Sequence, residues 1–192
     1  FIGEEGGRSF RFSPDGSHLA FVRNIDDEAQ VFALATDGGE ARQVTRHAGG
    51  IDGFRWGPDS GRIFFSAEEQ RSEEDQRQHE LGLDPVFVDE APNGKHEARF
   101  SNLWMHDLDA DQESRLTGED FIVGAFDVSP DGGRVILTAS PDDRTNYPFL
   151  SELYVLENDN GQLTRLTDNR TPERGPLWAP DGNSILYHAP SD

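Results

Sequence analysis

A tetrapeptide close to Ser-Pro-Asp-Gly occurs four times in this chain of 192 residues and constrains its fold more than any other feature. An aromatic or apolar residue precedes each copy, and a polar residue and then an apolar run follow it. Repeats spaced roughly 40–50 residues apart are typical of stacked supersecondary units. The copies span residues 13–16, 57–60, 129–132 and 179–182.

The recurrence of this tetrapeptide has an explanation in backbone geometry. Proline fixes φ at the second position of a tight turn, aspartate bonds to the local backbone, and glycine supplies positive φ before the next strand. We therefore expect each copy to join two adjacent antiparallel strands, with its aspartate shaping the turn rather than catalysing a reaction. The second copy is expected to keep this scheme by using Gly61, one place later than the other glycines.

Alignment of the four copies predicts four short strands in each complete repeat unit, because period-2 alternation and turn residues recur at matching places. Four strands per unit indicate a propeller blade. We therefore predict an all-β fold, a segment of a WD40-like β-propeller with about three and a half four-stranded blades. The expected blades span residues 8–46, 51–118 and 121–168, and a half blade follows over residues 174–190.

Three and a half blades do not close a ring, since closed propellers need roughly 4–8 blades. An open arc leaves exposed sheet edges, which associate with other strands unless they are covered. Two interpretations follow from this geometry. The chain is either a piece of a longer protein or a half that pairs with a copy of itself as a homodimer.

The composition excludes several classes of partner. The formal net charge is -20 at pH 7, and the single lysine, Lys95, stands beside sixteen arginines. Nucleic acid and anionic membrane each require a cationic surface, so neither is an expected partner. A GC-rich genome or adaptation to high salt would each explain this composition of charged residues. The chain has no cysteine and no apolar stretch of membrane-spanning length, so we expect a soluble protein, cytoplasmic or periplasmic.

One long insertion interrupts the second blade, over residues 68–100. It lies between the second and third strands, where the gap between turn motifs is roughly 25 residues longer than an ordinary blade needs. A smaller insertion, residues 140–147, occupies the matching place in the third blade. Both insertions should emerge on one face of the disc, because alternate connections of an antiparallel sheet share an edge. They are either tolerated surface insertions or a rim element that contacts a partner or gates a cavity.

Several segments resemble the propeller of prolyl-oligopeptidase-type serine peptidases, with the acylaminoacyl-peptidase and dipeptidyl-peptidase branches nearest. The likeness covers the whole chain, and its short motifs are shared with TolB-like propellers and other WD40-like repeats. The Asp84–Asp89 segment, placed before a third strand, favours the peptidases. The motifs that carry the likeness are Asp84-Pro85-Val86-Phe87-Val88, the run from Ser101 to Asp109, Ser114-Arg115-Leu116-Thr117, Leu153-Tyr154-Val155 and Leu163-Thr164-Arg165-Leu166-Thr167.

This resemblance implies a role as a lid rather than as a catalyst. In such peptidases the propeller docks on an α/β-hydrolase domain that carries the catalytic residues, and it restricts the substrates to peptides. This chain has no Gly-x-Ser-x-Gly elbow, and its serines fall on expected strands or turns, so we predict no catalytic residue here. The resemblance implies that the parent protein is a serine peptidase. The alternative is a non-catalytic TolB-like propeller that scaffolds protein complexes, with homodimerisation as a way to complete it.

The acidic insertion supplies the candidate contact residues. Some dipeptidyl peptidases of the family hold the amino terminus of a peptide with two propeller glutamates, and two carboxylates suit an ammonium group. The candidates here are Glu68, Glu69, Glu73 and Glu74, and a solvated acidic loop is the alternative interpretation. We expect no cofactor and no metal, because the six histidines are scattered over different repeat units and the acidic run from Asp107 lacks the glycine and glutamate of a calcium loop.

Overall fold

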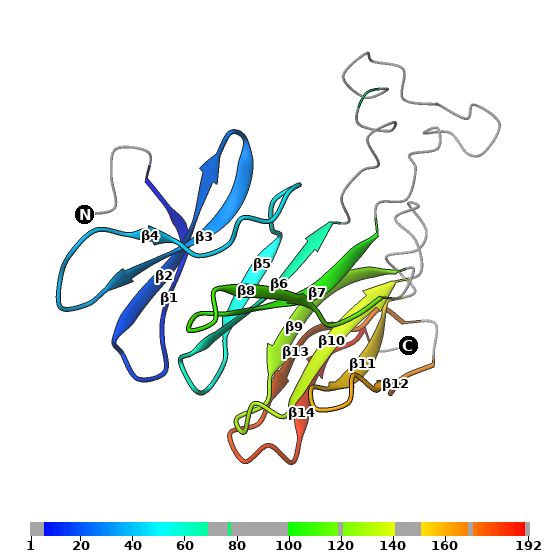
Figure 1. Cartoon of the computed structure of the whole chain (residues 1–192). Coiled ribbons are helices and arrows are strands. Elements are labelled where there is room, and N and C mark those ends of the chain that lie inside the picture. Colours follow the sequence, from blue (N-terminus) through cyan, green and yellow to red (C-terminus); the bar gives the residue numbers. More distant parts are fainter. Residues whose placement is uncertain are drawn as a thin grey trace.

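The computed structural model describes residues 6–68, 77, 100–118, 121–140, 151–168 and 171–190. The described residues form fourteen strands, and the sheets follow one another in chain order (Figure 1). The first sheet contains β1 (Arg8–Phe12), β2 (His18–Ile25), β3 (Glu28–Ala35) and β4 (Arg42–Gln43). The second group contains β5 (Gly53–Trp56), β6 (Arg62–Glu68), β7 (Ser101–Asp107) and β8 (Gln112–Arg115).

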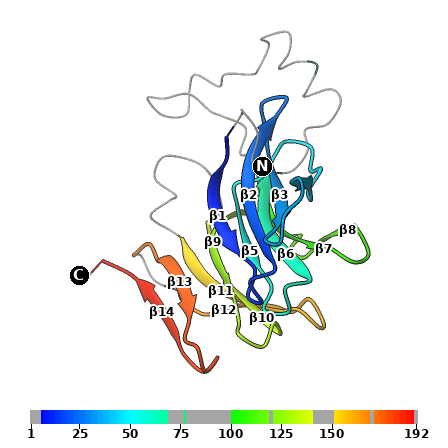
Figure 2. The same ribbon diagram turned by 90° about the vertical axis from the view of Figure 1, so that its left-hand side faces the viewer.

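The third group repeats this order with β9 (Ile122–Val128), β10 (Arg134–Ser140), β11 (Glu152–Glu157) and β12 (Leu163–Arg165). A two-stranded sheet of β13 (Arg174–Trp178) and β14 (Ile185–His188) ends the described chain, and Figure 2 shows it beside the third group. Neighbouring strands within each group are antiparallel. The second and third groups are also joined into one sheet by a parallel bridge from Ser101 to Ile122. The described strands thus amount to three and a half four-stranded blades.

The repeated tetrapeptide forms the turn between the first two strands of every group, as expected. In the first and third turns the serine hydroxyl donates a 2.6 Å hydrogen bond to the aspartate, Ser13 to Asp15 and Ser129 to Asp131. The amide two residues after each aspartate donates to the same carboxylate at 3.0 Å. These hydrogen bonds, the serine hydroxyl first, lower the pKa of both aspartates.

The second turn corrects one prediction. Gly61 does not replace the missing glycine, because Ser60 itself adopts the left-handed conformation with φ of 60°. The equivalent residues Gly16 and Gly132 both have φ of 73°. The turn therefore fixes the conformation of this position whichever residue occupies it. The Ser60 hydroxyl also accepts a 3.1 Å hydrogen bond from the amide of Asp15, which ties the second turn to the first.

A threonine fastens the outer strand of each complete blade to its third strand; Thr45 and Thr117 are buried and Thr167 is half-buried. In the second blade the Thr117 hydroxyl accepts a 3.0 Å hydrogen bond from the Leu103 amide and donates a 2.7 Å bond to Asn102 Oδ1. The equivalent amide-to-hydroxyl bonds join Val31 to Thr45 (2.9 Å) and Leu153 to Thr167 (2.8 Å). The amides of Leu116 and Thr117 both donate to the Leu103 carbonyl, so the outer strand ends in a bulge here.

The hydrophobic core lies between neighbouring blades rather than within one sheet. In the first junction, Ala20 and Val31 of the first blade belong to one cluster with Phe54, Ile63 and Phe65 of the second. All five side chains are buried. The second junction includes Phe64, Leu103, Phe126, Val135 and Leu137, and the third includes Ile136, Leu153 and Val155 with Trp178 and Ile185 packed against them. Each blade is therefore stabilised by apolar burial against the next one.

Replacing Thr117 by valine tests the threonine fastening. The valine keeps the side-chain volume but removes the acceptor of the buried Leu103 amide, so we expect the free energy of unfolding to fall by about 1–3 kcal/mol. Urea unfolding followed by tryptophan fluorescence measures the change. The control is Thr36→Val, because the exposed Thr36 hydroxyl donates to the Gly16 carbonyl and water can replace that bond. Equal losses in the two variants would contradict the assignment.

Candidate functional site

The structure describes only Glu68 among the four candidate glutamates; Glu69, Glu73 and Glu74 lie outside the described residues. Glu68 ends β6 and is half-buried. A second carboxylate, Asp52, lies close enough to feel its charge. Crowding by protein atoms first, and the negative charge of Glu68 second, raise the pKa of Asp52, although Asp52 keeps contact with solvent. This Asp52–Glu68 pair stands where the chain leaves β6 for the insertion.

A cluster of ionisable side chains lies beside this pair, at the junction of the first two blades. Glu113 of β8 faces two buried imidazoles, with Oε2 at 3.5 Å from His47 Nδ1 and Oε1 at 3.8 Å from His106 Nδ1. His106 Nε2 lies 3.3 Å from Asp111 Oδ1 on the other side of the ring. His47 follows β4, so the cluster joins the chain segment between the first two blades to the outer hairpin of the second blade.

The charge of Glu113 is stabilised by these neighbours. Burial alone would raise the pKa of Glu113, but the neighbouring His106 and His47 imidazoles, together with the 3.2 Å hydrogen bond from the Arg46 amide, lower it to about 2. The carboxylate therefore stays ionised. Its contacts join the second blade to the segment that follows the first blade, in addition to the apolar core between the two blades.

The His47 ring also connects the cluster to the insertion. Its Nε2 lies 3.4 Å from the carbonyl oxygen of Glu68, and its ring centroid lies 4.6 Å from that of Trp104. Trp104 is on β7, the strand that follows the insertion. The position of both ends of the insertion is thus fixed by contacts that cross the blade junction.

The described residues include no group of three or more histidine, cysteine, aspartate or glutamate side chains placed to hold a metal ion. In the hairpin that resembles a calcium loop, Asp107 Oδ1 accepts hydrogen bonds from the amides of Asp109 (3.0 Å) and Ala110 (2.9 Å). Asp111 instead faces His106 and Arg46. These acids therefore close a turn and form ion pairs.

One serine does contact a histidine, in the first turn. The Ser17 hydroxyl lies 2.8 Å from His18 Nδ1, and it also donates to both carboxylate oxygens of Asp15. In a catalytic triad the acid orients the histidine, whereas here the acid contacts the serine itself. The arrangement therefore stabilises the turn.

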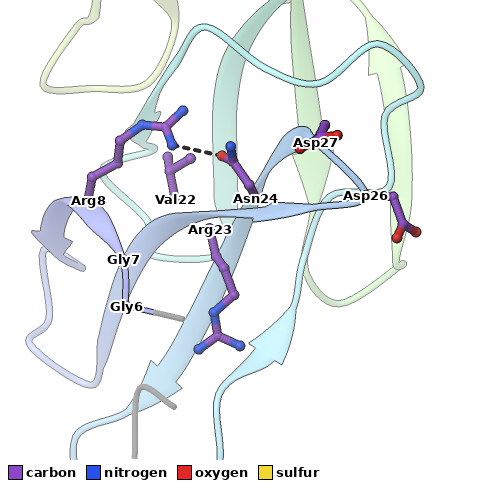
Figure 3. A pocket seen from close by; sticks show the side chains of 8 residues that line it. All are labelled: Gly6, Gly7, Arg8, Val22, Arg23, Asn24, Asp26 and Asp27. Carbon is purple, nitrogen blue, oxygen red and sulfur yellow. Dashed lines mark hydrogen bonds between the residues drawn. The ribbon is translucent and has the colours of Figure 1, made fainter. Parts of the chain in front are cut away.

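A shallow depression of about 560 Å³ lies at the end of the first blade (Figure 3). Arg8 donates a 2.8 Å hydrogen bond to Asn24 Oδ1 across it, and Arg23 stacks over the Phe32 ring at 4.7 Å. Asp26 and Asp27 form the adjoining turn, both with positive φ. The lining consists of glycine, valine, arginine, asparagine and aspartate, so it offers charge and hydrogen bonds but no nucleophile.

Both ends of the arc carry exposed large apolar side chains. At the first blade, Phe12 is 65% exposed and Phe10 is 48% exposed. Trp56 occupies the same repeat position as Phe12, in the second blade, and is 8% exposed. At the last blade, Leu177, Leu186 and Tyr187 are exposed. Phe21 and Phe65, which are equivalent to Tyr187 in the repeat, are buried.

Sequence reasoning missed the histidine–glutamate cluster. His47 lies between the first two blades, far in the sequence from His106 and Glu113 of the second blade. The alignment of the repeats places His106 on a third strand and Glu113 on a fourth strand, which predicts that these two are neighbours in the sheet. The position of His47 depends on how two blades pack, which no sequence pattern encodes.

Comparison with known proteins gives two curated relatives, and no protein-family model matches the chain. The uncharacterized peptidase YuxL of Bacillus subtilis is 26% identical over 163 residues, which are 80% of this chain and 25% of that protein. Dipeptidyl-peptidase 5 of Porphyromonas endodontalis is 24% identical over 197 residues, which are 92% of this chain and 28% of that protein. The chain thus spans about a quarter of the length of these curated relatives.

Solved structures with the same fold include TolB from Acinetobacter baumannii, with a TM-score of 0.62 and 21% identity over 97% of this chain and 39% of that one. Acylaminoacyl peptidase of Pyrococcus horikoshii has a TM-score of 0.62 and 19% identity over 94% of this chain and 27% of that one. The fold is a segment of a WD40-like β-propeller, as predicted. The resemblance to peptidases and to TolB-like propellers is likewise confirmed, since both curated relatives are peptidases and the TolB structure shares the fold.

Glu113→Gln tests the electrostatic role of the cluster through pH. The folded-state pKa of Glu113 is about 2 against an ordinary value of 4.5, so its stabilisation is complete above pH 4.5 and disappears as the pH falls through 2. We expect the variant to be less stable than the original protein by about 2–3 kcal/mol at pH 7, with the difference shrinking between pH 4.5 and 2. Urea unfolding at several pH values measures it.

The control is Glu40→Gln, which removes a negative charge from an exposed position of the same chain. This variant should show no comparable loss at pH 7. A Glu113→Gln difference that stays constant from pH 7 to 2 would show that the carboxylate charge does not act at this junction.

Proposed function

We propose that this chain is the propeller portion of a prolyl-oligopeptidase-type serine peptidase, and that it restricts the access of peptide substrates to a separate α/β-hydrolase domain. The observation that carries this proposal is the sequence similarity to two peptidases across most of the chain but only about a quarter of their length. The likeness in fold to acylaminoacyl peptidase supports it.

The arrangement of the insertions suits a gating role. The long insertion leaves β6 at Glu68 and returns at Ser101, and the shorter one leaves β10 at Ser140 and returns at Glu152. These connections leave the same edge of successive antiparallel sheets. Loops on a rigid scaffold are where binding functions concentrate. We assign to this edge the contact with substrate or with the hydrolase domain.

The acidic candidates fit the same edge. We propose that Glu68, Glu69, Glu73 and Glu74 contribute to binding the amino terminus of the peptide. The Asp52–Glu68 pair supports this role, because two nearby carboxylates favour an ammonium group between them. No cofactor is required for this function.

The second candidate is a TolB-like scaffold that binds other proteins without catalysis, either as part of a longer chain or as a homodimer. The likeness to TolB, which extends over 97% of this chain, favours this alternative. The two candidates differ in what the parent protein contains. A serine-directed fluorophosphonate labels a hydrolase domain and leaves a scaffold unlabelled.

The gating role predicts a change in substrate size when the insertion is removed from the full-length parent protein. Glu68 pairs with Ser101 in the sheet, so an Asn-Gly turn can replace residues 69–100 without moving β6 or β7. We expect the ratio of activity on long unfolded polypeptides to activity on short peptides to rise several-fold. Activity on short peptides should itself fall, because the deletion also removes Glu69, Glu73 and Glu74 of the proposed contact set. Peptidase assays with matched short and long fluorogenic substrates measure the ratio.

The control variant shortens the β11–β12 hairpin, which leaves the opposite edge of the sheets, and should leave the ratio unchanged. A parent protein that takes no fluorophosphonate label would rule out the peptidase and favour the scaffold. If the parent protein is labelled but the deletion does not change the ratio of long-substrate to short-substrate activity, the peptidase assignment stands and gating by this insertion is ruled out.

A further inference from the structure

The blades converge at their first strands. β9 contacts β5 on one side and β13 on the other. The Trp56 indole of β5 donates a 3.1 Å hydrogen bond from Nε1 to the carbonyl oxygen of Arg11 on β1. Among the described strands, the outer strands β4, β8 and β12 pair only within their own blades. The first strands β1, β5, β9 and β13 therefore form the inner wall of the arc, the side that surrounds the central channel in a propeller.

Two neighbouring first strands carry an arginine at the same place in the repeat, three residues before the turn proline. These are Arg11 on β1 and Arg55 on β5, and the equivalent residue on β9 is Asp127. In its sheet Arg11 pairs with Ala20, which belongs to the apolar junction with the second blade. Arg55 pairs with Phe64, which belongs to the junction with the third blade. Each arginine thus lies on a face that the following blade of this chain covers.

The positive charge of these two arginines is only partly compensated. The Arg55 side chain is half-buried, and its Nε lies 3.9 Å from Asp127 Oδ1, which is too long for a hydrogen bond. Asp127 is also engaged elsewhere, because its Oδ2 accepts a 2.9 Å hydrogen bond from the Trp178 amide. Arg11 is exposed and has no ion pair with any residue that the structure describes. Other arginines do have a carboxylate within 4.0 Å, namely Arg46, Arg62 and Arg165.

The two arginines lie close enough to repel each other. Burial first, and the positive charge of Arg11 second, lower the pKa of Arg55, and the negative charge of Asp127 does not cancel this shift. A guanidinium nevertheless stays protonated at every ordinary pH. The inner wall therefore holds two like charges near each other in a chain whose net charge is -20. An anion placed between the two guanidiniums removes this repulsion.

The Arg55 guanidinium has N–H groups left for a ligand. A guanidinium carries five such donors, and Nη1 of Arg55 uses one of them in a 3.0 Å hydrogen bond to the Phe54 carbonyl. The guanidinium carbon lies 5.8 Å from the centroid of the Phe126 ring, which supports the planar group by a cation–π contact. A planar guanidinium held in this way is suited to bind a carboxylate through two parallel hydrogen bonds.

We propose that Arg11 and Arg55 bind a carboxylate group of a peptide on the inner wall of the arc. The carboxylate chemistry rests on the two arginines, whereas the choice of a peptide as the ligand rests on the proposed function. The carboxylate belongs either to the C-terminus of the peptide or to an acidic side chain, since both make the same hydrogen bonds. A nucleic-acid phosphate does not fit, because the net charge of -20 repels a polyanion.

Titration of the isotope-labelled chain with blocked tripeptides, followed by NMR at low salt, tests the site. The probe is N-acetyl-trialanine with a free C-terminal carboxylate, and the matched control is its C-terminal amide. The Nε–H resonances of Arg11 and Arg55 should shift in a saturable way with the acid and not with the amide. Arg11→Gln should weaken binding of the acid about tenfold, because charge-assisted hydrogen bonds are lost. Arg42→Gln, which removes an exposed charge from the outer strand β4, should leave binding unchanged.

Asp127→Asn gives a result that a merely structural role would not produce. The asparagine keeps an acceptor for the Trp178 amide but removes the charge that competes for Arg55, so binding of the acid should tighten about threefold.

An amidated N-acetyl-Ala-Asp-Ala peptide separates the two sources of the carboxylate. Tighter binding than that of trialanine acid assigns the site to a side chain, and weaker binding assigns it to the C-terminus; either result supports the site. Equal binding of trialanine acid and amide would overturn it, as would equal losses in Arg11→Gln and Arg42→Gln. The assay needs no hydrolase domain, so a parent protein without fluorophosphonate label would rule out the peptidase and leave this result untouched.

Discussion

The aspartate of each repeated turn accepts a hydrogen bond from the amide two residues later, and this small closed turn sets the register of the first two strands in every blade. Because the register is the same each time, equivalent residues face the same way in successive sheets. One face of each blade then meets the opposite face of the next, and the apolar clusters form at those junctions. Neighbouring turns also touch, as the bond from the Asp15 amide to Ser60 shows.

Most of the fold could be predicted because its signals are local. The turn tetrapeptide and the alternating strands lie within a few residues of one another, so the number and order of strands follow from the sequence. The conformation of Ser60 could not be predicted from the glycine pattern, since the closed turn imposes positive φ on a residue that seldom adopts it. The threonine fastening was hidden in the same way, because a Leu-Thr or Val-Thr pair at the end of a strand has no distinctive composition.

The candidate site was predicted only in part. The acidity of the insertion pointed to Glu68, and Asp52 is its neighbour within the second blade. His106 pairs with Glu113 across β7 and β8, whereas His47 reaches Glu113 through packing between blades, which leaves no local spacing to recognise. The pairing at this junction has a functional consequence. The insertion emerges from a rigid, electrostatically fastened part of the arc, and a rigid base is what a loop needs if it is to control access.

The arc therefore combines a repetitive scaffold with one elaborated edge. The central claim is that these features belong to the propeller of a larger peptidase, and the most direct test is to read the parent gene on both sides of residues 1–192. The account predicts further turn motifs and a Gly-x-Ser-x-Gly segment between a strand and a helix. A reading frame that contains no such elbow would contradict the account.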